Sequence, residues 1–197
     1  MDYTTTADVF AYGDVAAPSA NQTAVMNKIV TAVSSRVDKI CSMNFSYGTY
    51  ANRQLPVRIG LDGLLTIYVD SPTITTLTSA SLRVGNLAQL LPISIANAVE
   101  EEHSYGTKVL FFGLDYYNVR EVSMLKAYLS YSGGWATLAD VPYDFELAVR
   151  RFCWYVFEQR GTPMNSTAVP EMGIITLPAA IPPDIMDVLK RYAWWWS

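Results

Sequence analysis

The chain has 197 residues, of which 51% are hydrophobic and 16% are charged, and its formal net charge is −4. This composition suits one domain with a sizeable core, and it argues against the basic surface with which proteins grip nucleic-acid phosphates. The two cysteines, Cys41 and Cys153, form no CxxC spacing, so we expect buried free thiols and not a zinc site or a disulfide framework.

Residues 1–18 are polar and turn-prone, with Gly13 and Pro18, and they predict a loosely held arm. They lack the basic and apolar regions of a signal peptide, and no run of 18 apolar residues occurs in the chain. We therefore expect a product of the cytosol that makes no contact with a membrane.

The first helix is predicted over residues 19–42. Ser19 is a helix N-cap, and Gln22 three residues later completes a capping-box pattern. Apolar residues then recur at helical spacing as far as Ile40. Residues 43–56, which follow, read as irregular.

A β region is predicted over residues 57–138. Alternating apolar residues flank an Asp62-Gly63 turn, and residues 73–84 are rich in threonine and β-branched side chains. Residues 86–118 read as an insertion with a polar tip at residues 100–103 and a short strand at 108–112. We expect residues 119–138 to form a hairpin around the glycine turn at residues 132–134.

The second strong helix is predicted over residues 142–160, with Pro142 at its start. A proline-rich loop follows at 162–183, and a short helix and tail complete the chain at 184–197. The expected fold is α+β and mainly helical: a single domain, 1–197, built as a helical bundle with an embedded antiparallel β region.

Residues able to carry chemistry are few. The single histidine, His103, follows three glutamates, and consecutive residues rarely converge on one metal ion. Five aspartates lie near turns or helix starts, where capping is their ordinary role: Asp62, Asp70, Asp115, Asp140 and Asp144. We therefore predict no catalytic residue, no metal ligand and no cofactor.

The aromatic residues suggest a different role, because aromatic side chains are enriched at protein interfaces. Trp154 and Phe157 make the second helix bulky on more than one face. The chain closes on Trp194, Trp195 and Trp196, which cannot all point to one side of a helix. Packing within the chain and docking on a partner both remain open for this end. The candidate interface residues are Tyr192, Trp194, Trp195, Trp196, Trp154, Phe157 and Arg191.

The order of these features resembles that of head-to-tail adaptor proteins, the head-completion or connector proteins of tailed bacteriophages. The resemblance covers residues 21–193. It begins with the helix 29–40 and Phe45, continues with the strand 64–69 and the turn 71–74, and includes Tyr131-Ser132-Gly133-Gly134-Trp135 before Val141-Pro142-Tyr143-Asp144. The helix 185–192 is similar to the family's closing element. The insertion 86–118 and the tryptophan-rich end depart from the family pattern.

The resemblance implies a subunit without catalytic residues, found in a ring that commonly holds twelve copies. Such a ring lies in the neck of the virion, between the portal protein and the tail, stopper or tail-terminator proteins, and is assembled in the host cytoplasm. DNA passes through its channel without specific binding.

Three alternatives remain. The first is another virion structural role, such as a tail-completion or minor tail protein. The second is a small hydrolase that uses carboxylates alone. The third is a binding module in which the insertion holds a ligand with Tyr105, Phe111 and Phe112.

Overall fold

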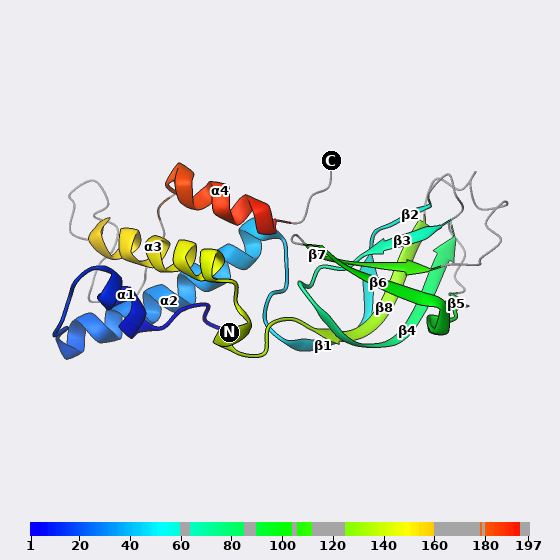
Figure 1. Cartoon of the computed structure of the whole chain (residues 1–197), viewed down its shortest axis with the longest axis horizontal. Coiled ribbons are helices and arrows are strands. Elements are labelled where there is room, and N and C mark those ends of the chain that lie inside the picture. Colours follow the sequence, from blue (N-terminus) through cyan, green and yellow to red (C-terminus); the bar gives the residue numbers. More distant parts are fainter. Residues whose placement is uncertain are drawn as a thin grey trace. The chain divides into compact units, whose positions relative to one another are not determined.

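The computed structural model describes residues 1–59, 64–84, 90–103, 106–111, 125–159, 178 and 180–193. Backbone contacts divide the chain into two compact units (Figure 1). Residues 1–42 and 137–193 form the first, which we call the helical unit. Residues 43–136 form the sheet unit. The single domain predicted over residues 1–197 stays a prediction.

The helical unit contains α1 (Thr6–Tyr12), α2 (Ala20–Cys41), α3 (Tyr143–Gln159) and α4 (Pro183–Tyr192). The capping box predicted at Ser19 and Gln22 is present, and Ser42 ends α2 in the left-handed conformation. The helices predicted over 19–42 and 142–160 are therefore confirmed. Of the proline-rich loop 162–183, only residues 178 and 180–183 lie within the described residues.

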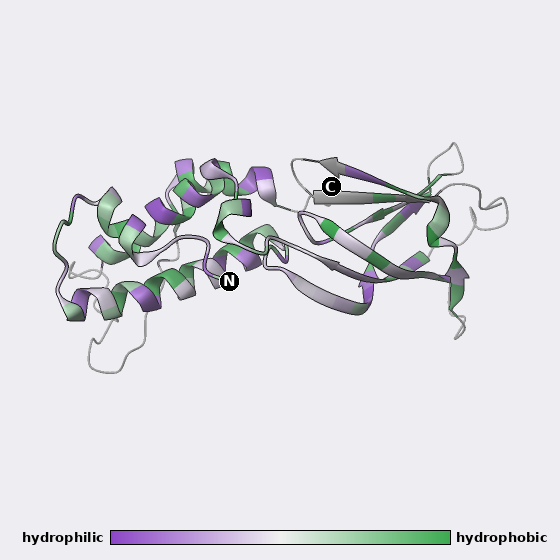
Figure 2. Cartoon of the chain, turned by 60° about the horizontal axis from the view of Figure 1, so that its bottom comes forward, coloured by the Kyte–Doolittle hydropathy of each residue, from purple (hydrophilic) through white to green (hydrophobic). Residues whose placement is uncertain are grey.

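One apolar face of each long helix forms the core of the helical unit, while hydrophilic residues cover the opposite face (Figure 2). The fully or almost fully buried side chains come from all four helices: Val9, Phe10, Met26, Ile29, Val30, Val33, Val37, Cys41, Phe145, Ala148, Val149, Phe152, Cys153, Val156, Ile185 and Leu189. Both cysteines are free and buried, as the sequence predicted.

The N-terminal segment corrects one prediction, because residues 1–18 are not a loose arm. Thr5 caps α1, and Tyr3 is completely buried. The Tyr3 hydroxyl donates to Asp38 Oδ1 at 2.5 Å, and its ring meets Phe145 edge to face with 5.5 Å between centroids. Tyr3 anchors the segment to the helical unit. The polar composition of the residues around it gave no sign of this anchor in the sequence.

The sheet unit holds two antiparallel four-stranded sheets. The first has the order β1 (Gly48–Leu55), β8 (Leu125–Gly133), β4 (Ile74–Val84) and β5 (Leu91–Ile93). The second has the order β2 (Val57–Ile59), β3 (Leu65–Tyr68), β7 (Gly106–Phe111) and β6 (Ala98–His103). Side chains from both sheets form one core cluster, including Leu55, Leu65, Ile67, Leu82, Val109, Leu129 and Tyr131.

The predicted fold class was wrong in its proportions. The protein is α+β, but it is not mainly a helical bundle, since its described residues form two antiparallel sheets as well as four helices. The error came from stretches read as irregular or inserted: residues 43–56 contain β1, and 86–118 contain β5, β6 and β7. Pairing with distant strands decides these segments, and local sequence carries little of that information.

Two further predictions fail for the same reason. The hairpin predicted over residues 119–138 is absent from its described part, residues 125–138, because β8 is a central strand between β1 and β4, and Trp135 makes only an isolated bridge to Ser46. Residues 100–103 are not a loop tip, because they belong to β6 and pair with β7. The pairing predicted around Asp62-Gly63 is confirmed in β2 and β3, although the turn itself lies outside the described residues.

Candidate partner interface

Trp154 and Phe157 form an aromatic cluster on the outer part of the helical unit. Their rings stack with centroids 5.5 Å apart, and Phe157 also meets Phe10 of α1 edge to face at 5.7 Å. The Trp154 indole lies directly over Gly13, where any added Cβ would collide with the ring. Its Nε1 donates to Glu158 Oε1 at 2.9 Å. Both rings are half-buried by contacts within the unit, so each has a structural role whether or not it also meets a partner.

Tyr192 lies near the end of α4 and is also engaged within the helical unit. Its ring meets Phe145 with 4.9 Å between centroids, and its hydroxyl donates to Asp144 Oδ1 at 2.5 Å. Arg191 beside it is exposed. Trp194, Trp195 and Trp196 lie outside the described residues, so the docking role of this end stays a prediction.

A basic stripe runs along the exposed side of α2. Lys28, Arg36 and Lys39 are exposed, and Ala32 and Ser35 lie between them at helical spacing. The only acid on α2 is Asp38, whose carboxylate accepts from Tyr3. Within the described part of the chain, none of the three cations forms an ion pair. The stripe is notable because the whole chain carries a net charge of −4.

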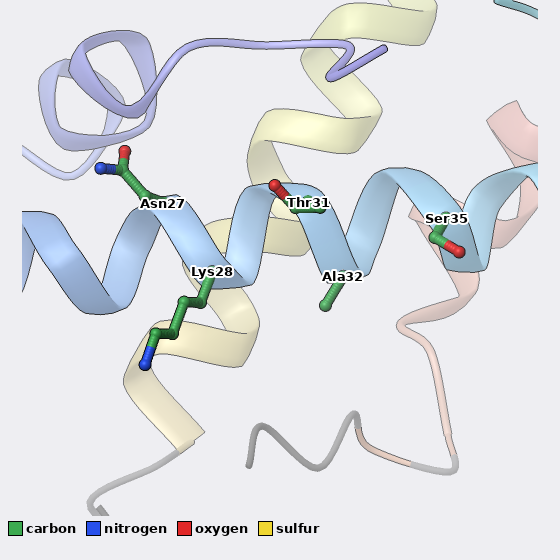
Figure 3. A pocket seen from close by; sticks show the side chains of 5 residues that line it. All are labelled: Asn27, Lys28, Thr31, Ala32 and Ser35. Carbon is green, nitrogen blue, oxygen red and sulfur yellow. The ribbon is translucent and has the colours of Figure 1, made fainter. Parts of the chain in front are cut away.

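A shallow depression of about 470 Å³ lies along the same helix, and its lining is small and polar (Figure 3). Figure 3 shows Lys28, Ala32 and Ser35 on one side of α2 and Asn27 and Thr31 toward the other. Thr31 donates to Asp2 Oδ2 at 3.1 Å, so the N-terminal segment borders that other side. Small side chains at Ala32 and Ser35 leave a surface into which a protruding side chain of a partner can fit.

The sheet unit exposes apolar side chains in one short stretch of sequence. Leu90, Leu91, Ile95 and Val99 are between 37% and 45% exposed, and Glu100 and Glu101 follow them at the surface. Leu90 precedes β5, Leu91 belongs to it, Ile95 lies in the short 3-10 turn Ile95–Asn97, and Val99 belongs to β6. Both β5 and β6 are edge strands of their sheets. Clustered exposed apolar residues are typical of surfaces that meet other proteins. No sequence prediction singled out this stretch as an interface.

Asp70 was predicted to be an ordinary turn residue, but it forms the centre of a buried polar network. Its carboxylate accepts from Tyr131 at 2.6 Å, from Asn44 at 2.6 Å and from the Arg53 guanidinium. The Asp70 side chain is only 5% exposed. Burial and the neighbouring Asp70 carboxylate raise the pKa of the Tyr131 hydroxyl, so Tyr131 acts as a fixed donor. A single aspartate after a strand carries no signal that distant donors will converge on it.

Close backbone contacts explain why the Tyr131–Trp135 motif has glycine at two positions. Gly133 lies against the Thr73 carbonyl, and Gly134, at φ +105°, lies against the Ser46 carbonyl, so neither position has room for a Cβ. Trp135 then stacks on Phe45 with centroids 4.8 Å apart. Three of the segments behind the adaptor resemblance, around Phe45, Thr73 and Gly134, therefore meet at one place in the sheet unit.

Both cysteine thiols are buried, which fits a role in packing. Burial raises the pKa of Cys41 to about 12, and it raises the pKa of Cys153 as well. Among the described residues, no group of three or more histidine, cysteine, aspartate or glutamate side chains is placed to hold a metal ion. In the same part of the chain, no helix is both long and apolar enough to cross a membrane.

No protein-family model matches the sequence, and no curated protein matches it. Solved structures do match. A chain in the neck of an empty gene transfer agent (GTA) particle, computed with C6 symmetry, is similar with a TM-score of 0.50 and 12% identity, covering 95% of this chain and 88% of that one. Chains of a native GTA virion and of a native GTA neck computed with C12 symmetry match with TM-scores of 0.43 and 0.44, at 14% and 13% identity. The first of these similarities shows a shared fold.

Proposed function

We propose that the protein is a structural subunit of the neck of a phage-like particle, where it acts as an adaptor between head and tail. The observation that carries this proposal is the fold shared with a chain of a GTA particle neck over 95% of the sequence. A local match could come from a common motif, whereas this one spans residues of both units.

The motifs of the sheet unit support the same proposal. The resemblance to phage adaptors rested on loose motifs far apart in sequence, around Phe45, Thr73 and Gly134. These motifs meet at one place, where close backbone contacts require Gly133 and Gly134. A set of motifs with a common structural purpose is better support than the same motifs taken one by one.

We further propose that the protein works as a ring of copies, twelve as the resemblance implies, with the portal protein on one side and tail or stopper proteins on the other. The related neck structure was computed with C6 symmetry, as expected for a particle whose parts repeat around an axis. A ring of identical subunits needs two different, complementary surfaces on each copy. In this role the protein binds no cofactor and catalyses no reaction, and DNA passes along its channel.

Electron microscopy of particles from the producing cell tests this function. We expect a tagged copy to label the neck, between capsid and tail, and symmetry-averaged maps to contain a ring of this fold. Cells lacking the protein should accumulate filled or partly filled heads without tails. Label on the tail tube or tail tip, with necks intact in its absence, would contradict the adaptor role and favour a minor tail protein.

The C-terminal end can be tested separately, because α4 is anchored by residues before it. Ile185 and Leu189 are buried, and Tyr192 packs on Phe145. Deletion of residues 193–197 should therefore leave the unfolding midpoint almost unchanged. If Trp194, Trp195 and Trp196 dock on the portal or a neighbouring subunit, the truncated protein will be missing from particles. Normal incorporation of the truncated protein would reject the docking role.

A further inference from the structure

The four edge strands of the sheet unit differ in how well they resist contact with another protein. β1 is interrupted by a register shift between Tyr50 and Arg53, with Asn52 at φ +49°. β2 and β5 have three residues each; Pro56 precedes the first, and Pro92 lies within the second. Bulges, short length and proline are the usual means of blocking an edge.

β6 has no bulge and no proline, and its edge is protected only by charged side chains. It runs for six residues, Ala98–His103, and pairs with β7 in unbroken register. No other strand of the described residues pairs with its outer side. Val99 is 45% exposed on it, and Glu100 and Glu101 are exposed beside Val99. The β6 edge is thus acidic, regular and open, with one apolar side chain at its start.

The basic stripe of α2 complements this edge in charge and in shape. Lys28, Arg36 and Lys39 present three cations, while Ala32 and Ser35 form a shallow floor between them. From Lys28 to Lys39 the helix rises about 17 Å, and the six residues of β6 span about 20 Å. The two surfaces are therefore of similar length and opposite charge.

We propose that the α2 stripe of one copy binds the β6 edge of the next copy. In this contact Val99 and Glu101, which lie on the same face of β6, meet the small residues around Ala32 and the cations Arg36 and Lys39. Glu100 lies on the opposite face of the strand and adds to the negative charge of the edge. The contact uses two different surfaces of one chain, which is the heterologous kind that a ring requires. It rests on the proposed function, since it names the surfaces by which neighbouring neck subunits meet.

Pairing of two β6 edges with each other is disfavoured. An isologous β6–β6 contact would bring the glutamates of two copies together, and like charges across a strand pair are destabilising. A nucleic acid could meet the α2 stripe, but that would leave the open β6 edge uncovered. A second copy accounts for both surfaces at once.

Charge reversal on each side, separately and together, tests the contact in full-length protein. One variant carries R36E and K39E, the second carries E100K and E101K, and the third carries all four changes. All four side chains are exposed. Each variant is first compared with wild type by circular dichroism and unfolding midpoint, so that a loss of stability is not mistaken for a loss of the contact. The combined variant also keeps the wild-type net charge.

The readout is the number of copies per purified particle, measured by quantitative mass spectrometry. We expect the number of copies per particle to fall at least about tenfold for each one-sided variant. For the combined variant it should recover to within about threefold of wild type, because complementary charges at an interface set partner choice. The control K126E changes the net charge in the same direction as R36E with K39E but lies on neither surface, and it should assemble normally.

A cysteine pair gives an independent measurement. A32C combined with V99C should yield cross-linked dimers and higher multimers in oxidised particles, while each single variant yields none. Cys41 and Cys153 are completely buried and should not interfere.

Two results would overturn the contact: a combined variant as defective as the one-sided variants, or one-sided variants that assemble normally, including an R36E/K39E variant that fails only to retain DNA. In each case the wild-type ring at the neck would stand, so the proposed function would survive. Absence of the wild-type protein from particle necks would remove both proposals together.

Discussion

Asp70 shows how one side chain can organise a unit without being part of an active site. It lies just after β3 and is joined to Arg53 of β1, Tyr131 of β8 and Asn44 of the segment entering the unit. Arg53 also lies over the Tyr50 ring at 5.7 Å. Removing the Asp70 carboxylate is costly, because the completely buried Tyr131 hydroxyl loses its acceptor without regaining water, although Arg53 is 43% exposed.

Asp70→Asn should lower the free energy of unfolding by about 3 kcal/mol, since it removes the charge that Arg53 faces and turns an amide donor toward other donors. Tyr131→Phe is the matched control. It removes one hydroxyl and leaves Asp70 two donors, so it should cost about 1 kcal/mol. Urea unfolding followed by tyrosine and tryptophan fluorescence measures both. Equal costs for the two variants would show that Asp70 is not the centre of the network.

At the scale of elements, α1 and α3 illustrate an aromatic cluster that serves the fold. The sequence placed Trp154 and Phe157 among candidate partner contacts. In the structure they pack against Phe10 and Gly13, which belong to a segment expected to be loose. Their partner role stays a prediction, and stability measurements can separate it from the structural role.

Trp154→Ala should lower the free energy of unfolding by about 2 kcal/mol, because a half-buried indole loses its contacts with Phe157 and α1. Tyr143→Ala is a suitable control, since Tyr143 is an aromatic residue at the start of the same helix and is 70% exposed. It should change stability by less than about 0.5 kcal/mol. Urea unfolding followed by far-ultraviolet circular dichroism makes the comparison. A Trp154 variant as stable as the Tyr143 variant, but absent from particles, would instead favour direct docking.

At the scale of the whole molecule, the division into two units makes a prediction about folding. The main apolar cluster of the sheets lies within residues 43–136, as do the Asp70 network and the stack of Phe45 on Trp135. A unit with its own core can fold by itself.

A fragment of residues 43–136 should give the circular dichroism of antiparallel sheet and a cooperative urea transition. Leu129→Asp within the fragment is the control, because Leu129 is completely buried and a charge there should abolish the transition. A fragment that stays unfolded in buffer, with the full chain folded, would show that the sheet unit depends on the helical unit.

The sequence alone was sufficient for features set by neighbouring residues. The capping box at Ser19, the amphipathic faces of α2 and α3, the pairing of β2 with β3 and the burial of both cysteines were all predicted. Helical periodicity and caps depend on residues within a few positions of each other, so they can be read directly. The order of these features also suggested the phage adaptor resemblance.

Only the tertiary structure decided the features that join distant segments. β1 and β8 pair across some 80 residues, Tyr3 is buried against Asp38 and Phe145, and four strands meet in each sheet. Such pairings depend on long-range burial, for which a short stretch of sequence has no distinctive pattern. The basic stripe of α2 and the open edge of β6 belong to the same class. Their residues are visible in the sequence, but which side chains face outward, and which strand is left at an edge, is decided only when the chain has folded.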